Sequence, residues 1–197
     1  MSAHASSRYE VRNECKVICM RPVFLLFLTL IGTAFASEPA VVFDPVFECY
    51  RVNTAWGFVM SGAAIGRDGV IVRYSLRDMA LRPTPQKEGG ATYYDSSNLR
   101  AHFAGATTSN KIDPDQLRNN LALVDDAIKG NISASLTGVR DAGVSTCHAY
   151  ILDAGANRYR DVELGSDGAV SDMRFENDSK AAATLRDWLM SVGIATK

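Results

Sequence analysis

The sequence predicts an α+β fold, in which an antiparallel β-sheet of about four to five strands is packed on one face by two α-helices. Strand-like segments precede each of two helix-like segments, and no internal repeat occurs. The clearest strand is 70–76, "VIVRYSL", which is rich in β-branched and aromatic residues. The second face of such a sheet is expected to be open, as a surface for binding.

The first part of the sheet is expected to come from residues 46–76. Segments 46–52 and 54–65 are predicted strands, and the glycines of the second suit a bulge or a close backbone approach. Asp68-Gly69 is typical of a hairpin turn leading into 70–76. Residues 77–112 follow, with proline and glycine clusters around "ATYYD", and predict a long loop that is either functional or mobile.

The first helix is expected to begin at Asp113, a good N-cap, with Pro114 at the first helical position. Gly130 is placed to end it. Apolar residues at three- and four-residue spacing give this helix one core-facing side: Leu117, Leu121, Val124 and Ile128.

The second part of the sheet is predicted to be a hairpin of "STCHAYILD" and "RYRDVEL" around "AGAN". A turn at Asp167-Gly168 and a short strand over 169–175 follow. Asn177 or Asp178 is expected to cap a closing helix over 179–193. Its apolar face contains Ala181, Leu185, Trp188, Leu189 and Val192.

Residues 1–36 have the features of a signal region. Arg21, an apolar run from Val23 to Ile31 and the small residues of "AFA" match the three parts of a secretory signal peptide over 20–36, cleaved near Ala36. The alternative is an uncleaved anchor, for which the run is short. Residues 1–19 are polar and are predicted to be untranslated or dispensable. We therefore expect a periplasmic or secreted single domain, 37–197, that meets a membrane only through the signal peptide.

Processing would leave two of the four cysteines, Cys49 and Cys147. Two thiols in an oxidising compartment usually pair, so a disulfide between them is predicted. The adjacent His148 raises the alternative of a Cys–His nucleophile. In a strand, however, neighbouring side chains point to opposite faces, so Cys147 and His148 are expected to diverge.

No established catalytic, nucleotide or metal motif is present in the sequence. Only His102 and His148 would remain after processing, without HExxH or CxxC, and "DAGANRYRDVEL" fails the EF-hand pattern. We therefore predict no catalytic residue, no metal and no cofactor. The charges are balanced, with 21 Lys and Arg against 22 Asp and Glu, so nucleic acid is not an expected partner.

Two stretches, "WGFVMSGAAIGRDGVIVRYSL" and "STCHAYILDAGANRYRDVELGSDG", and a following helix with "LRDWL" resemble emfourin-like small inhibitors of bacterial metallopeptidases. Those proteins have a glycine-rich hairpin, a helix, a second hairpin and a closing helix. The resemblance implies a non-enzymatic protein that binds and blocks an enzyme. It assigns no inhibitory residue to this chain.

Two functions follow from these observations. The first is a secreted or periplasmic non-enzymatic binding protein, an inhibitor or immunity-type protein that occludes an unknown protein target. Its candidate contacts are aromatic, a residue class enriched at binding hot spots: Trp56, Phe58, Tyr93 and Tyr94. Trp56 and Phe58 have core packing as an alternative role. The second function is a secreted hydrolase with an unrecognised acidic site, in which Asp161 and Glu163 share a strand face or His148 lines a cleft.

Overall fold

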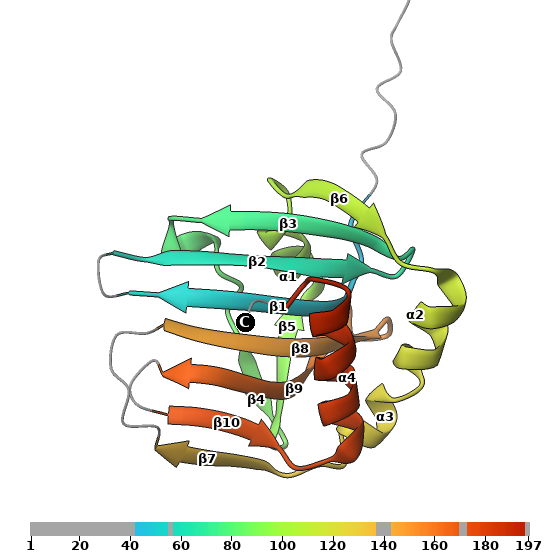
Figure 1. The fold of residues 1–197 in the computed structure, drawn as a ribbon. Coiled ribbons are helices and arrows are strands. Elements are labelled where there is room, and N and C mark those ends of the chain that lie inside the picture. Colours follow the sequence, from blue (N-terminus) through green and yellow to red (C-terminus); the bar gives the residue numbers. More distant parts are fainter. Residues whose placement is uncertain (1–41, 55–56, 137–142, 170–172, 196–197) are drawn as a thin grey trace, which may run out of the picture. The chain divides into compact units, whose positions relative to one another are not determined.

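The computed structural model describes residues 42–54, 57–136, 143–169 and 173–195. Within these ranges the chain forms one ten-stranded sheet in which every recorded strand pair is antiparallel. Eight strands follow one path, and the two others branch from it at β9 (Figure 1). In sheet order the path is β4 (Gln86–Glu88), β5 (Ala91–Asp95), β9 (Arg158–Ala169), β8 (Gly143–Asp153), β1 (Pro45–Asn53), β2 (Val59–Gly66), β3 (Val70–Leu76) and β6 (Thr107–Lys111). On the branch, β10 (Met173–Asn177) pairs with β9 and with β7 (Ile132–Leu136).

The expectation of four to five strands packed by two helices is therefore wrong. Much of the additional sheet consists of short polar strands, such as β4 and β6, whose residues are all exposed. A strand that buries neither face has no alternation of apolar and polar residues, so hydrophobic periodicity could not reveal it. Additional short helices also occur, as described below.

Helices α2 (Pro114–Leu121), α3 (Val124–Ala127) and α4 (Lys180–Ser191) pack on one side of the sheet, and α4 crosses it in front of β8 and β9 (Figure 1). We call this the helix face. The edge of the Phe47 ring meets Trp188 at a centroid distance of 5.2 Å. Leu185, Trp188 and Leu189 of α4 are buried against strand residues such as Ile65 and Leu164. Burial of these large side chains is the main source of stability on this face.

The helix boundaries agree in part with those expected. Asp113 caps α2 by accepting hydrogen bonds from the amides of Asp115 and Gln116, and Pro114 occupies the first turn. The expected single helix is broken between Leu121 and Val124, where a separate short turn of helix begins. The closing helix is capped by Ser179, which accepts from the amide of Ala182, and the expectation of Asn177 or Asp178 at this position is wrong.

The opposite side of the sheet is covered by residues 77–112, so the expectations of a loop in this segment and of an open sheet face are both wrong. The segment contains a 3₁₀ turn (Met79–Leu81), β4, β5, helix α1 (Ser96–His102) and β6. In Figure 1, α1, β4 and β5 lie behind β1, β8 and β9. Leu99 and Phe103 are buried here against sheet residues such as Tyr74. We call this side the covered face.

Both predicted hairpins form. Strands β2 and β3 are joined at Asp68-Gly69, where Gly69 has a φ of +83° and the amide of Val70 donates to the Asp68 carboxylate. Strands β8 and β9 are joined over 154–157, where Asn157 has a φ of +50°. The expected turn at Asp167-Gly168 is absent, because these residues continue β9 alongside β8.

The predicted disulfide is present. Cys49 of β1 and Cys147 of β8 are directly opposite one another in the antiparallel register, with their Cα atoms 4.1 Å apart. His148 points to the covered face instead, where its ring stacks on Tyr50. The divergence expected from strand geometry is thus observed, and Cys147 and His148 form no nucleophilic pair.

Two predictions concern residues that the structure does not describe. The signal region 1–36 and the candidate contact Trp56 lie outside the described ranges. No described helix is long and apolar enough to cross a bilayer.

Removing the disulfide by replacing both Cys49 and Cys147 with alanine should lower the free energy of unfolding by about 2–5 kcal/mol, because the bond closes a long loop in the unfolded chain. The sequence separation of the two cysteines is 98 residues. Urea denaturation followed by circular dichroism would measure the change. An unchanged midpoint, with an unchanged slope, would show that the bond does not contribute to stability.

Candidate functional site

A fully buried carboxylate lies at the centre of the covered face. Glu48 of β1 is 1% exposed, and its neighbours Phe47 and Cys49 point to the helix face. The Tyr74 hydroxyl of β3 donates to Glu48 Oε1, and the Tyr150 hydroxyl of β8 donates to Oε2. His102 Nε2 of α1 lies 3.1 Å from Oε1. These four residues are the buried carboxylate cluster.

The two ring nitrogens of His102 both face oxygens that only accept hydrogen bonds. One is Glu48 Oε1, and the other is the backbone carbonyl of Leu81, 3.3 Å from Nδ1. Each ring nitrogen thus lies within hydrogen-bonding distance of one acceptor oxygen. His102 therefore connects the buried carboxylate with the 3₁₀ turn that lies over it.

Opposing effects set the charge state of Glu48. Burial by itself raises the pKa of this carboxyl, but the hydrogen bond and charge of His102, with the hydroxyls of Tyr150 and Tyr74, outweigh it. The pKa of Glu48 is consequently lowered from its ordinary value, and the residue is ionised at neutral pH.

A second buried ion pair lies beside this cluster. His148 Nδ1 is 2.7 Å from Asp161 Oδ1, and the two side chains are 7% and 8% exposed. The Tyr50 ring stacks on the imidazole at 5.4 Å with an interplanar angle of 7°. Burial by itself lowers the pKa of His148. The charge and hydrogen bond of Asp161 outweigh this effect and raise the pKa to about 9. His148 Nε2 has no hydrogen-bond partner among the described residues.

The arrangement of these two groups suits a structural role. The cavities beside the disulfide, β5, β3 and α4 are not lined by Glu48, His102 or His148. Within the described ranges, no set of three or more His, Cys, Asp or Glu side chains could hold a metal ion. Aromatic rings pack around Glu48, His102 and His148, whereas Asp161 lines the cleft beside β5.

A cleft of about 390 Å³ lies where β5 and β10 separate along β9. β5 pairs with β9 as far as Asp161, and β10 meets β9 at Gly165. The polar side chains that line the cleft include Thr92, Asn131, Arg160, Asp161, Glu163 and Asn177. Burial raises the pKa of Glu163, with the Asp161 charge adding to this and the His148 charge opposing it.

A tyrosine and an arginine form a fixed pair at the rim of this region. Tyr93 of β5 is half-buried, and the Arg158 guanidinium carbon of β9 lies 3.9 Å from its ring centroid. Arg158 also donates to Glu88 and lies 3.7 Å from Asp153 Oδ2. Tyr93 is directly opposite Arg160, which lines the cleft. We call Tyr93, Arg158 and Arg160 the Tyr–Arg patch.

The structure separates the aromatic residues expected to contact a partner. Tyr93 reaches the surface, whereas Tyr94 faces inward and meets the Tyr150 ring edge to face at 6.1 Å. Burial, with the charges of Asp161, Tyr50 and Glu48, raises the pKa of Tyr94. Phe58 packs against the core of the covered face. Both residues are partly buried and pack against the core of the covered face.

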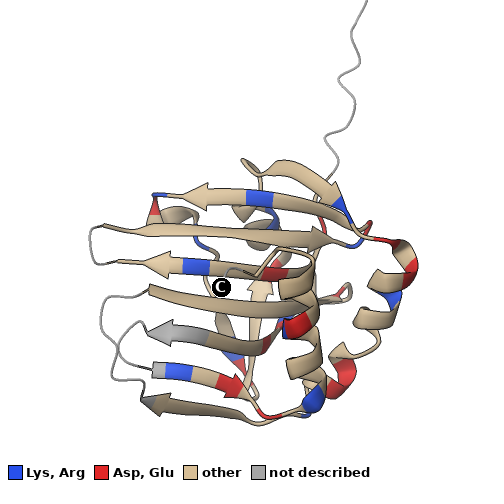
Figure 2. Cartoon of the chain, viewed as in Figure 1, with Lys and Arg blue, Asp and Glu red and all other residues tan. Residues whose placement is uncertain are grey.

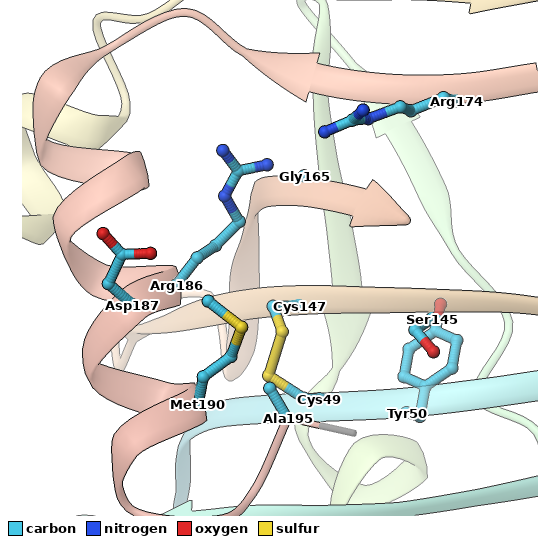
Figure 3. A pocket seen from close by; sticks show the side chains of 10 residues that line it. All are labelled: Cys49, Tyr50, Ser145, Cys147, Gly165, Arg174, Arg186, Asp187, Met190 and Ala195. Carbon is cyan, nitrogen blue, oxygen red and sulfur yellow. A yellow bond between two sulfur atoms is a disulfide. The ribbon is translucent and has the colours of Figure 1, made fainter. Parts of the chain in front are cut away.

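A third region is the pocket of about 130 Å³ beside the disulfide on the helix face (Figure 3). Both cysteines line it, together with Ser145, Gly165, Arg174, Arg186, Asp187 and Met190. The guanidinium of Arg186 lies over Gly165, so a Cβ at that position would approach Arg186 Nη1 to 2.3 Å. Glycine is thus required for the arginine to reach this position.

The sequence offered little indication of the buried carboxylate cluster or the Arg186 pocket. Glu48 within "VFECYRV" is an acidic residue in an otherwise apolar strand, and that is the one local signal for it. Its partners Tyr74, His102 and Tyr150 are brought together only by the sheet register and by α1. Arg186 and Gly165 likewise meet through the packing of α4 on β9.

Comparisons with protein-family models, curated proteins and solved structures found no match to this chain. The emfourin-like resemblance stays a prediction from the sequence pattern.

Replacing Glu48 with glutamine should lower the free energy of unfolding by about 3–5 kcal/mol, because one partner of a buried ion pair is lost and an amide donor faces hydroxyl donors. Urea denaturation at pH 7 would measure this. Asp125→Asn, at an exposed position of α3, is the matched control and should change stability by no more than about 0.5 kcal/mol. Equal effects of the two substitutions would contradict the role of Glu48.

The His148–Asp161 pair should make stability fall as the pH rises from about 6.5 to about 9. The folded chain keeps the His148 proton up to its raised pKa of about 9, whereas the unfolded chain releases it near 6.5. The stabilisation is therefore complete below pH 6.5 and is lost as the pH passes through the folded pKa. Denaturation across this range should show a decline of up to about 3 kcal/mol. Asp161→Asn should flatten the profile, and an unchanged slope in that variant would refute the assignment.

Proposed function

We propose that this chain is an exported, non-enzymatic binding protein that occludes a protein target, as an inhibitor or immunity-type protein. The observation that carries the proposal is the Tyr–Arg patch, in which Tyr93 and Arg158 are held at the surface in a fixed stack. Tyrosine and arginine are among the residues most enriched at binding hot spots. A side chain that is already ordered loses less conformational entropy when a partner binds.

The surroundings of the patch favour a protein partner. The cleft beside Arg160 is lined largely by polar side chains, which suits a projecting polar side chain of a partner. Arg158 and Arg160 belong to the β8–β9 hairpin, and β8 is tied to β1 by the disulfide. In the view of Figure 2, Lys and Arg are interspersed with Asp and Glu. A mixed distribution of charged residues along the chain favours a protein over a nucleic acid.

Export is supported by two observations. The segment 20–36 has the composition of a signal peptide. A disulfide persists in an oxidising compartment, so the Cys49–Cys147 bond is compatible with a secreted or periplasmic protein. The resemblance to emfourin-like inhibitors supports the same kind of role.

A photo-crosslinking amino acid at position 93 of the full chain, expressed in cells that export it, would test the proposal. We expect a covalent adduct with one protein, whose enzymatic activity decreases as the adduct forms. The adduct yield should fall at least about tenfold with Arg158→Ala, the loss expected for a hot-spot residue. The same crosslinker at Thr108, on the exposed edge strand β6, is the matched control. Equal adduct yields from the two positions would refute the proposal.

The alternative function, a secreted hydrolase with an acidic site, is favoured by one observation: Asp161 and Glu163 both line the cleft. Glu163, whose pKa is raised, would act as the general acid. In that case Glu163→Gln should abolish hydrolysis of chromogenic ester, glycoside or peptide substrates by the purified chain, whereas Tyr93→Ala should leave it unchanged. Absence of turnover in the unsubstituted chain would exclude this alternative for those substrates.

A further inference from the structure

The disulfide forms part of the wall of the pocket beside α4. Cys147 is 8% exposed and Cys49 is 3% exposed, and both line the pocket beside α4 (Figure 3). The residue opposite Cys147 on β9 is Gly165, which has no side chain to cover the sulfur. On the other side of β1, Cys49 is opposite Ala63. Cys147 is thus the more exposed of the two cysteine residues.

The same pocket contains a cation that can bind an anion. The Arg186 guanidinium lies over Gly165, the residue opposite Cys147 in the β8–β9 register, and its ion pair with Glu176 is long, 3.9 Å. Glu176 is half-exposed, so this pair is weak and can be exchanged for another carboxylate. Arg174 lines the pocket as well, and Asp187 is the acidic residue among the lining side chains. An arginine offers a carboxylate two parallel hydrogen bonds.

We propose that the Cys49–Cys147 disulfide is a thiol-exchange site, at which an anionic low-molecular-weight thiol forms a mixed disulfide with Cys147. Arg186 binds the carboxylate of the incoming thiol. This use of the helix face is separate from the Tyr–Arg patch and does not depend on the function proposed for it.

The exchange is balanced without a further reactant. The incoming thiol first loses its proton to solvent, and the thiolate attacks Sγ of Cys147. A bond forms between the two sulfur atoms as the bond to Cys49 Sγ breaks, and the electron pair leaves on Cys49 as a thiolate. The sulfur of the small thiol is oxidised to the disulfide level, and Cys49 is reduced. Cys49 then takes up a proton from solvent.

The test uses the purified, oxidised full chain under native conditions. Reduced glutathione serves as the anionic thiol. Cysteamine serves as the cationic thiol, and the group that carries its sulfur is similar in size to that of glutathione. Samples are quenched at intervals with iodoacetamide, which alkylates the released Cys49. Intact and tandem mass spectrometry then locate the adducts and give the rate for each thiol.

We expect glutathione on Cys147 and the alkyl group on Cys49. The ratio of the glutathione rate to the cysteamine rate should fall roughly tenfold in Arg186→Gln, as expected for loss of a charge-assisted pair. It should be unchanged in Arg118→Gln, an exposed α2 position. The cysteamine rate in Arg186→Gln shows whether that variant keeps the native pocket.

Three results would overturn the proposal. The first is a disulfide that reacts with neither thiol unless denaturant is added. The second is an adduct confined to Cys49. The third is a rate ratio that Arg186→Gln leaves unchanged.

Discussion

The ionised carboxylate of Glu48 is the constraint on which the covered face depends. Removing a carboxylate from water is costly unless hydrogen bonds and an opposite charge replace the lost solvation. Here the replacements are the hydroxyls of Tyr74 and Tyr150 and the ring of His102. They come from β3, β8 and α1, so ionisation of one buried group requires three separate elements to be in place. The cluster thereby favours one arrangement of residues 77–112 on the sheet over other arrangements.

Strand β1 joins the two faces of the sheet. Its alternating side chains direct Glu48 into the buried carboxylate cluster and Cys49 into the disulfide on the other side. The helix face is held by apolar burial beneath α4 and by this covalent bond. The covered face combines apolar burial with ionic pairs that respond to pH from both directions, because acid neutralises Glu48 and alkali neutralises His148.

With both faces covered, the groups available for function lie at the rims. The Tyr–Arg patch and its cleft occupy the place where β5 and β10 separate along β9, and the disulfide pocket lies beside α4. Tyr93 and Tyr94 show how closely interior and surface adjoin. They are neighbours in β5 with opposite orientations, so that Tyr93 stacks with Arg158 whereas Tyr94 packs against Tyr150.

The sequence by itself determined the features that depend on local geometry. Asp113 and Pro114 fixed the start of α2, Asp68-Gly69 fixed a hairpin turn, and the period of two along β8 separated Cys147 from His148. The disulfide was predictable because processing would leave two cysteines. Caps, turns and strand alternation involve residues close in the chain, so their physical basis can be read locally.

Only the tertiary structure decided how residues 77–112 cover the sheet and which groups meet Glu48 and Arg186. The polar strands β4 and β6 have no hydrophobic alternation, and their strand conformation comes from pairing with β5 and β3. The partners of Glu48 lie 26, 54 and 102 residues away in the chain. Contacts over such separations depend on strand register and on the curl of the sheet, because these fix which distant side chains share one buried space.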